Sequence, residues 1–130
     1  MKFRSTVLAS ALAIAALAVT AQASASCSYP KAPDKIPDGT KATKEEMLAG
    51  MKTMRAYNDL VAKYTECLQA DHDAAVAKID PSVDDKKKAD QKAELDKVQQ
   101  QKNDAAVDEA QTVTARFNDQ IKAFKAAHTN

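Results

Sequence analysis

The sequence predicts an all-α protein: an antiparallel two-helix hairpin with an N-terminal proline-rich extended segment that is disulfide-linked to the first helix. Apolar residues recur at intervals of three and four from Met47 onward, and one proline, Pro81, interrupts the pattern. Both cysteines, Cys27 and Cys67, follow an apolar leader. With 130 residues in all, and about a hundred after the leader, the chain fits one domain.

Residues 1–25 have the pattern of a secretory signal peptide. A basic start is followed by an apolar run from Val7 to Val19, and small residues offer cleavage after Ala23 or after Ala25. An apolar run of about a dozen residues is too short to anchor a protein in a membrane. We therefore expect an exported protein, periplasmic or secreted, without membrane insertion after cleavage.

The charge balance argues against strongly electrostatic partners. Cleavage removes Lys2 and Arg4, which takes the net charge from +1 to −1. Lys86, Lys87 and Lys88 form the densest basic run, but aspartates bracket it and no aromatic residue is interleaved. We therefore expect no binding of nucleic acid, and interpret the run as a solvated charge cluster.

Cys27 and Cys67 are the only cysteines of the chain, and disulfides form and persist in exported proteins. One intramolecular bond is the expected pairing. A lipidated Cys27 is the alternative, although Ser24 stands where such a site carries an apolar residue; two free thiols are the other. The spacing does not match the Cys-x-x-Cys motif of redox catalysts, so the bond is expected to be structural.

The segment 26–43, called the strap below, is expected to be extended. It holds three of the four prolines of the chain together with Gly39, and these residues exclude a regular helix. About 16 residues of polyproline chain span on the order of 50 Å, which is enough to reach Cys67 from the start of the first helix. We expect the strap to fold back along the flank of that helix.

The first helix is predicted over residues 44–79. Thr43 and Glu46 match a capping box, and Gly50 costs the helix only about 1 kcal/mol relative to alanine. Its apolar stripe contains Met47, Met51, Met54, Tyr57, Val61, Tyr64, Leu68, Ala75, Val76 and Ile79.

Residues 80–130 are predicted to form a short turn and the second long helix. Asp80 is the expected N-cap, with Pro81 at the first helical position. The C-terminal half of this helix has a full apolar face: Ala106, Ala110, Val113, Phe117, Ile121 and Phe124. The N-terminal half offers only Ala89, Ala93, Leu95 and Val98. Whether residues 84–104 pack within the monomer or only against a partner stays open.

Antiparallel packing places Met47 and Met51 opposite Val113 and within reach of Phe117. Ile121 and Phe124 then extend past the start of the first helix. The strap residues expected to cover them are Tyr29, Pro30, Pro33, Ile36 and Pro37.

The chain contains a set of short motifs: C-x2-P from Cys27, P-x-G from Pro37, A-T-x2-E-M from Ala42, C-L from Cys67 and R-F-N from Arg116. In this pattern the chain resembles an uncharacterised family of small exported, periplasmic helical proteins of proteobacteria. The resemblance covers nearly the whole mature chain. It implies an envelope location and a bond between the two cysteines, and it implies no activity, ligand or site residue.

The strongest candidate for ligand chemistry is the group Met47, Met51 and Met54. Thioether sulfurs at helical spacing in an exported protein suit Cu(I). The same residues lie on the apolar stripe, where methionine fills core gaps and packs on aromatic rings such as Phe117. Packing is the favoured interpretation, so no metal or cofactor is expected, and Cu(I) or small-ligand binding is the alternative function.

No catalytic residue is predicted. His72 has aspartates on both sides, but adjacent helical residues point apart, so we expect a satisfied interface histidine paired with Asp90 or Glu94. General acid–base chemistry needs a pocket that separates two pKa values, and a thin hairpin offers little concavity. The sequence therefore predicts a non-enzymatic envelope protein that binds another protein or copies of itself.

Overall fold

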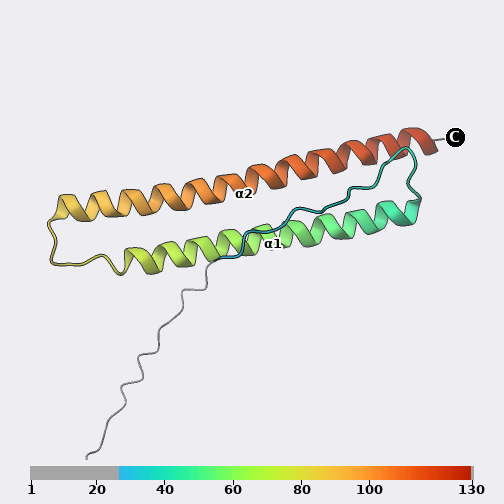
Figure 1. Ribbon diagram of the computed structural model, residues 1–130. Helices are drawn as coiled ribbons and strands as arrows, with labels where there is room; N and C mark the ends of the chain where they lie inside the picture. Colours follow the sequence, from blue (N-terminus) through green and yellow to red (C-terminus); the bar gives the residue numbers. More distant parts are fainter. Residues whose placement is uncertain (1–26, 130) are drawn as a thin grey trace, which may run out of the picture.

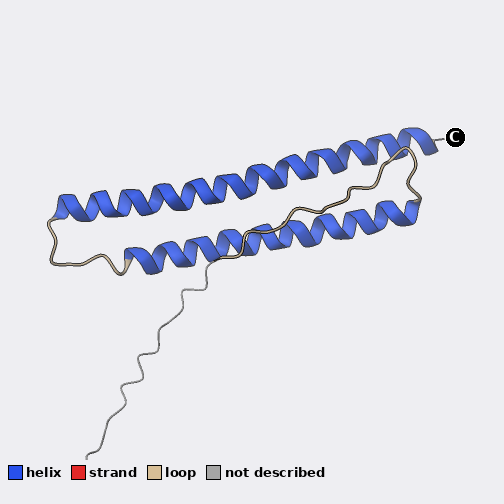
Figure 2. Ribbon diagram, in the orientation of Figure 1, coloured by secondary structure: helices blue, strands red, loops and turns tan. Residues whose placement is uncertain are grey.

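The computed structural model describes residues 27–129, which contain two helices, α1 (Lys44–Val76) and α2 (Asp85–His128). The helices lie side by side and antiparallel, joined by a short connection, and the described residues include no strand (Figures 1 and 2). The predicted fold class is thereby confirmed. The predicted signal peptide, with cleavage after Ala23 or Ala25, lies outside the described residues.

Helix α1 begins where the capping box predicts. The Thr43 hydroxyl accepts a hydrogen bond from the Glu46 amide at 3.2 Å, and the Glu46 carboxylate accepts one from the Thr43 amide at 2.7 Å. The helix ends at Val76, three residues before the predicted end at Ile79. Bonds of the i to i+3 type, from Lys78 to Ala75 and from Ile79 to Val76, tighten the chain and end the α-helical pattern.

Helix α2 begins later than predicted. The carboxylate of Asp80 accepts a hydrogen bond from the Ser82 amide at 2.8 Å, which closes a local turn instead of a helix. Asp84 is the N-cap, because its carboxylate accepts from the Lys87 amide at 2.9 Å. The prediction that Asp80 and Pro81 open the second helix was therefore wrong by four residues.

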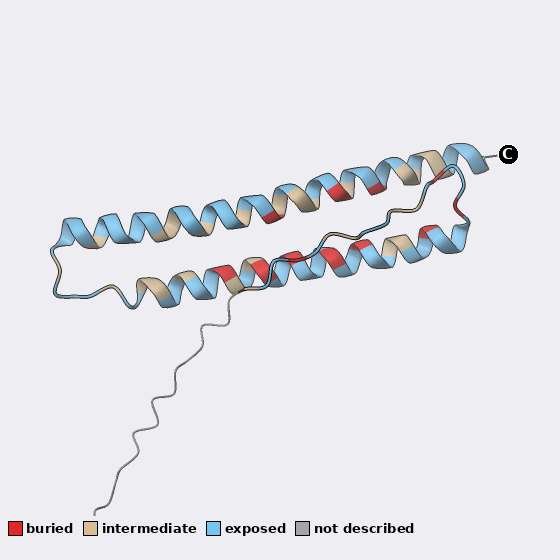
Figure 3. Ribbon diagram, in the orientation of Figure 1, coloured by how far each residue is buried: buried red, intermediate tan, exposed pale blue. Residues whose placement is uncertain are grey.

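The core occupies only part of the hairpin. No described residue after Leu68 on α1, or before Ala106 on α2, is buried, and Figure 3 shows this end of the hairpin almost wholly exposed or half-buried. The buried apolar residues are Ala42, Met47, Met54, Tyr57, Val61, Tyr64, Leu68, Ala106, Val113 and Phe117. Residues 27–68 and 105–129 are called the strap-side half below, and residues 69–104 the turn-side half.

The strap runs back along α1, as predicted, from Cys27 toward the open end of the hairpin (Figure 1). The Cys27–Cys67 disulfide joins its beginning to α1, with the two Cα atoms 5.7 Å apart. Near its other end, the Gly39 amide donates to Gln120 Oε1 on α2 at 2.8 Å. The strap therefore bridges both helices and completes the core as a third layer.

Not all of the strap residues that were predicted to cover Ile121 and Phe124 lie at that end of the hairpin. Ile36, Ile121 and Phe124 are each partly buried and pack against the core. Tyr29 and Pro30 instead lie beside Leu60 and Tyr64. The reason is geometric: the disulfide fixes Cys27 at Cys67, so the next few residues cannot reach the open end.

Neither α1 nor α2 contains an apolar stretch long enough to cross a membrane.

Candidate functional site

A disulfide anchors the first described residue of the strap to α1. The Cys27–Cys67 bond links residues 40 positions apart, and one carboxylate oxygen of Asp71 lies 3.2 Å from the Cys27 sulfur. The two sulfurs and this oxygen lie within 4.8 Å of one another. Metals bind the cysteine thiolate, and both sulfurs are held in the disulfide, so the cluster is not a metal site in the oxidised protein.

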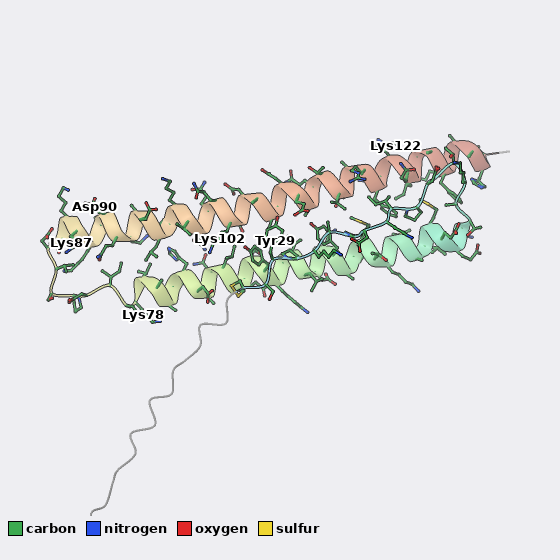
Figure 4. The ribbon with its side chains drawn as sticks, in the orientation of Figure 1. Tyr29, Lys78, Lys87, Asp90, Lys102 and Lys122 are labelled. Atoms are coloured by element: carbon green, nitrogen blue, oxygen red, sulfur yellow. A yellow bond between two sulfur atoms is a disulfide. The ribbon has the colours of Figure 1, made fainter. Side chains whose placement is uncertain are left out.

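A group of tyrosines fastens the strap next to the disulfide. The Tyr29 hydroxyl lies 2.7 Å from the Glu109 carboxylate, to which it donates, and 3.3 Å from the Ala105 carbonyl oxygen. Its ring meets Tyr64 edge to face, with centroids 5.3 Å apart. The hydrogen bond to Glu109, followed by desolvation, raises the pKa of Tyr29 to about 12. Tyr29 therefore connects the strap to both helices (Figure 4).

The third tyrosine, Tyr57, is part of the core. Its hydroxyl is buried and has no hydrogen-bond partner among the described residues. Desolvation raises the pKa of Tyr57, and the negative charge of Glu109 adds to the effect. The Tyr57 hydroxyl therefore stays neutral at ordinary pH.

The three methionines considered as alternative Cu(I) ligands do not share one environment. Met47 and Met54 are buried in the core, whereas Met51 is half-buried. The sulfur of Met51 lies 3.9 Å from an Arg55 guanidinium nitrogen, which places a positive charge beside the most accessible thioether. These positions favour packing, and Cu(I) binding stays a prediction.

The grooves along the strap are open troughs. One of about 470 Å³ lies beside Ile36, Pro37 and Gly50, and another of about 410 Å³ lies beside Tyr29, Leu60 and Tyr64. The second is lined almost entirely by apolar atoms, apart from the flanking Lys31 and Lys63. Neither trough contains histidine or cysteine thiol groups suited to nucleophilic chemistry.

The turn-side half has a polar network where the sequence predicted a single ion pair. Nε2 of His72 lies 2.6 Å from Asp96 Oδ1, and Nδ1 lies 3.2 Å from Asp73 Oδ1. The predicted partners, Asp90 and Glu94, were therefore wrong: Asp90 pairs instead with Lys86 at 3.2 Å. The expectation that flanking aspartates point away from the ring also fails for Asp73, whose side chain folds back toward Nδ1.

The charge state of the network follows from these contacts. The hydrogen bond with Asp73, and then the one with Asp96, raises the pKa of His72. Lys92, and next His72, lowers the pKa of Asp96. The ring is 10% exposed, so it lies between the helices and not in solvent.

The apolar face of the turn-side half is thin. Val98 is 39% exposed, and Leu95, Ala75 and Val76 are half-buried. A small cavity of about 140 Å³ is lined by residues of both helices, among them His72 and Leu95. Packing within the monomer is therefore incomplete over residues 84–104. Nearby, Lys86 and Lys88 pair with aspartates on the surface, in agreement with a solvated charge cluster.

Two close contacts were missed by sequence reasoning. A Cβ atom on Gly39 would lie 1.9 Å from the Gln120 carbonyl oxygen, and one on Gly50 would lie 2.8 Å from Pro37 Cγ. Both glycines therefore make room for the strap to approach a helix. The available signal was that the chain has only two glycines, one in the strap and one in α1.

Comparisons of the chain with protein-family models, curated proteins and solved structures gave no match.

Proposed function

We propose that this protein acts outside the cytoplasm as a non-enzymatic contact protein, whose turn-side half binds the helices of a second copy. The observation that carries the proposal is the uneven covering of the hairpin. The strap completes the core of one half, while the other half keeps both helices accessible (Figure 3). A partly apolar, uncovered helix pair is suited to pairing with other helices.

Export is supported by the leader pattern of residues 1–25 and by a disulfide, which is typical of oxidising compartments. The resemblance to an exported family of proteobacteria agrees with this location. A non-enzymatic role is supported by the open shape of the grooves and by the absence of a converging catalytic group among the described side chains.

A second copy is the occupant that the charges favour. Along α2, lysines and carboxylates are interleaved over residues 85–104, and pairs such as Lys86–Asp90 and Lys92–Asp96 already form within one helix. A two-fold axis brings the same patch of both copies together, and interleaved charges of both signs allow lysines of one copy to face carboxylates of the other. The expected net charge of −1 after cleavage gives little repulsion between copies.

The test is the oligomeric state of the mature, oxidised protein. We expect native mass spectrometry and analytical ultracentrifugation to detect a dimer, and Val98→Glu to weaken it by about tenfold or more because a charge would enter the shared apolar face. Gln100→Glu is the matched control, since Gln100 is an exposed position two residues away.

A protein that stays monomeric at all accessible concentrations would refute self-pairing. A dimer equally stable in both variants would place the interface elsewhere on the molecule.

A further inference from the structure

His72 is held between two hydrogen-bond acceptors. Its Nε2 faces Asp96 at 2.6 Å and its Nδ1 faces Asp73 at 3.2 Å, and an ionised carboxylate only accepts hydrogen bonds. A neutral imidazole has one N–H, so it satisfies one of these contacts and turns a lone pair toward the other carboxylate. Only the imidazolium form, with two N–H groups, satisfies both.

These contacts belong to a chain of hydrogen bonds that crosses from one helix to the other. Lys92 donates to both oxygens of Asp96 at 2.7 and 3.0 Å. On α1, Gln69 donates to Asp73 at 2.8 Å and accepts from Gln99 of α2 at 2.7 Å. In the described structure, the two hydrogen bonds that connect α1 directly to α2 through side chains are His72–Asp96 and Gln69–Gln99.

The groups around the ring favour its charged form. From α1, Asp73 contacts the ring and Asp71 lines the same small cavity. From α2, Asp96 contacts the ring, Lys92 is bonded to Asp96, and Lys102 lines the cavity. Both charged groups in direct contact with the ring are carboxylates, and Lys92 is bonded to one of them, Asp96.

We propose that His72 is a proton-operated clasp, which joins α1 to α2 in the turn-side half when it is protonated and releases α2 when it loses the proton. The thin packing of this half explains why one residue has this influence. No described residue between Leu68 and Ala106 is buried, so little apolar contact compensates for a lost ionic bridge. The remaining half is held by the strap and the disulfide, which do not involve His72.

The direction of the pH effect follows from linkage. The pKa of His72 is raised in the folded protein above its ordinary value near 6.5. Its contribution to closure is therefore complete below that ordinary value, and it is lost as the pH rises through the raised value of the folded state. Acidification closes the clasp and alkalinisation opens it.

The first measurement uses nitrogen-15 NMR to determine the protonation state of the His72 ring in the oxidised, mature protein. We expect both ring nitrogens of His72 to be protonated at pH 6, and Asp96→Asn to lower the titration midpoint toward 6.5. Asp90→Asn is the matched control, an exposed carboxylate on the same helix that contacts Lys86. A neutral ring at pH 6, or an equal shift in both variants, overturns the clasp.

The second measurement is hydrogen exchange between pH 5.5 and 8.5, corrected for the intrinsic exchange rate. The protection of residues 85–104 should fall about tenfold for each unit by which the His72 midpoint exceeds its value in the open form. In His72→Gln, protection of this segment should stay at the high-pH level throughout.

Residues 110–124 report whether the variant is folded, because they pack in the strap-side half and should not respond. A flat profile for residues 85–104 in the wild-type protein, while His72 titrates, rejects the proposal. The experiment is independent of self-pairing, since it is performed on monomer at low concentration as well as on any dimer.

Discussion

At the scale of single residues, the glycines of this chain provide space and not unusual backbone angles. Neither Gly39 nor Gly50 has a positive φ. A Cβ atom at Gly39 would meet the Gln120 carbonyl at 1.9 Å, which is rigid backbone, whereas one at Gly50 would meet Pro37 and Phe117 side-chain atoms at 2.8 and 2.9 Å. The two positions therefore differ in how easily the obstacle can move.

This difference predicts the order of two substitutions. Gly50→Ala gains about 1 kcal/mol of helix propensity but overpacks the contact with the strap, at a cost of about 1–3 kcal/mol, so a small net loss of stability is expected. Gly39→Ala gains nothing in a helix and should cost more, about 2–3 kcal/mol. Urea unfolding with the disulfide intact measures both. A Gly50→Ala variant more stable than the wild type would show that the strap does not press on α1.

Hydrogen-bond partners were predictable where a known local motif defines them. The capping box depends on residues three positions apart, and it was visible in the sequence. The partner of His72 lies on the other helix, and the end of α1 and the start of α2 both differ from the prediction by a few residues. That shift changes which carboxylate faces the ring, and so Asp96 takes the place expected for Asp90 or Glu94.

At the scale of elements, the start of α2 depends on which of two nearby aspartates, Asp80 or Asp84, acts as the N-cap. Asp80 and Asp84 each accept a backbone hydrogen bond, but only the bond from Lys87 to Asp84 satisfies a donor of the first turn of α2. From the sequence, Asp80-Pro81 has the stronger start signal. The bond from the Ser82 amide to Asp80 joins residues only two positions apart, and it closes a turn before the helix begins.

The cap assignment makes a discriminating prediction. Asp84→Ala should lower the free energy of unfolding by about 1 kcal/mol, because it leaves an amide of α2 without its acceptor. Asp80→Ala should cost clearly less, since its partner lies in an exposed turn. Thermal unfolding followed by circular dichroism compares the two variants. An equal or larger effect of Asp80→Ala would return the N-cap to the position that the sequence favoured.

At the scale of the whole molecule, the division into two halves follows from the distribution of apolar residues. Helical periodicity and one proline were enough to predict the hairpin, and the sparse face of residues 84–104 signalled a weaker half. The limits of the strap-covered region were not predictable in detail. They depend on how far the two helices and the extended strap each advance per residue, starting from the disulfide. Cys67 fixes where the covering begins, and the Gly39–Gln120 contact fixes where it ends.

The disulfide therefore determines how firmly the strap is attached, and its removal has a specific readout. The pKa of Tyr29 is about 12 while the strap holds its hydroxyl against Glu109, compared with about 10 for a free tyrosine. In the double variant Cys27→Ser, Cys67→Ser, the chain-entropy model predicts that the free energy of unfolding falls by about 3–4 kcal/mol.

If the strap then detaches, one more tyrosine should ionise between pH 9.5 and 11, which ultraviolet absorbance measures directly. Two causes of a lower Tyr29 pKa must be separated: detachment of the strap and loss of the Glu109 charge. Glu109→Gln, with the disulfide intact, tests the second alone, because it removes the charge without freeing the strap. An unchanged tyrosine titration in the double variant would mean that Pro37, Gly39 and the apolar contacts hold the strap by themselves, and the covalent bond would then add stability without determining the fold.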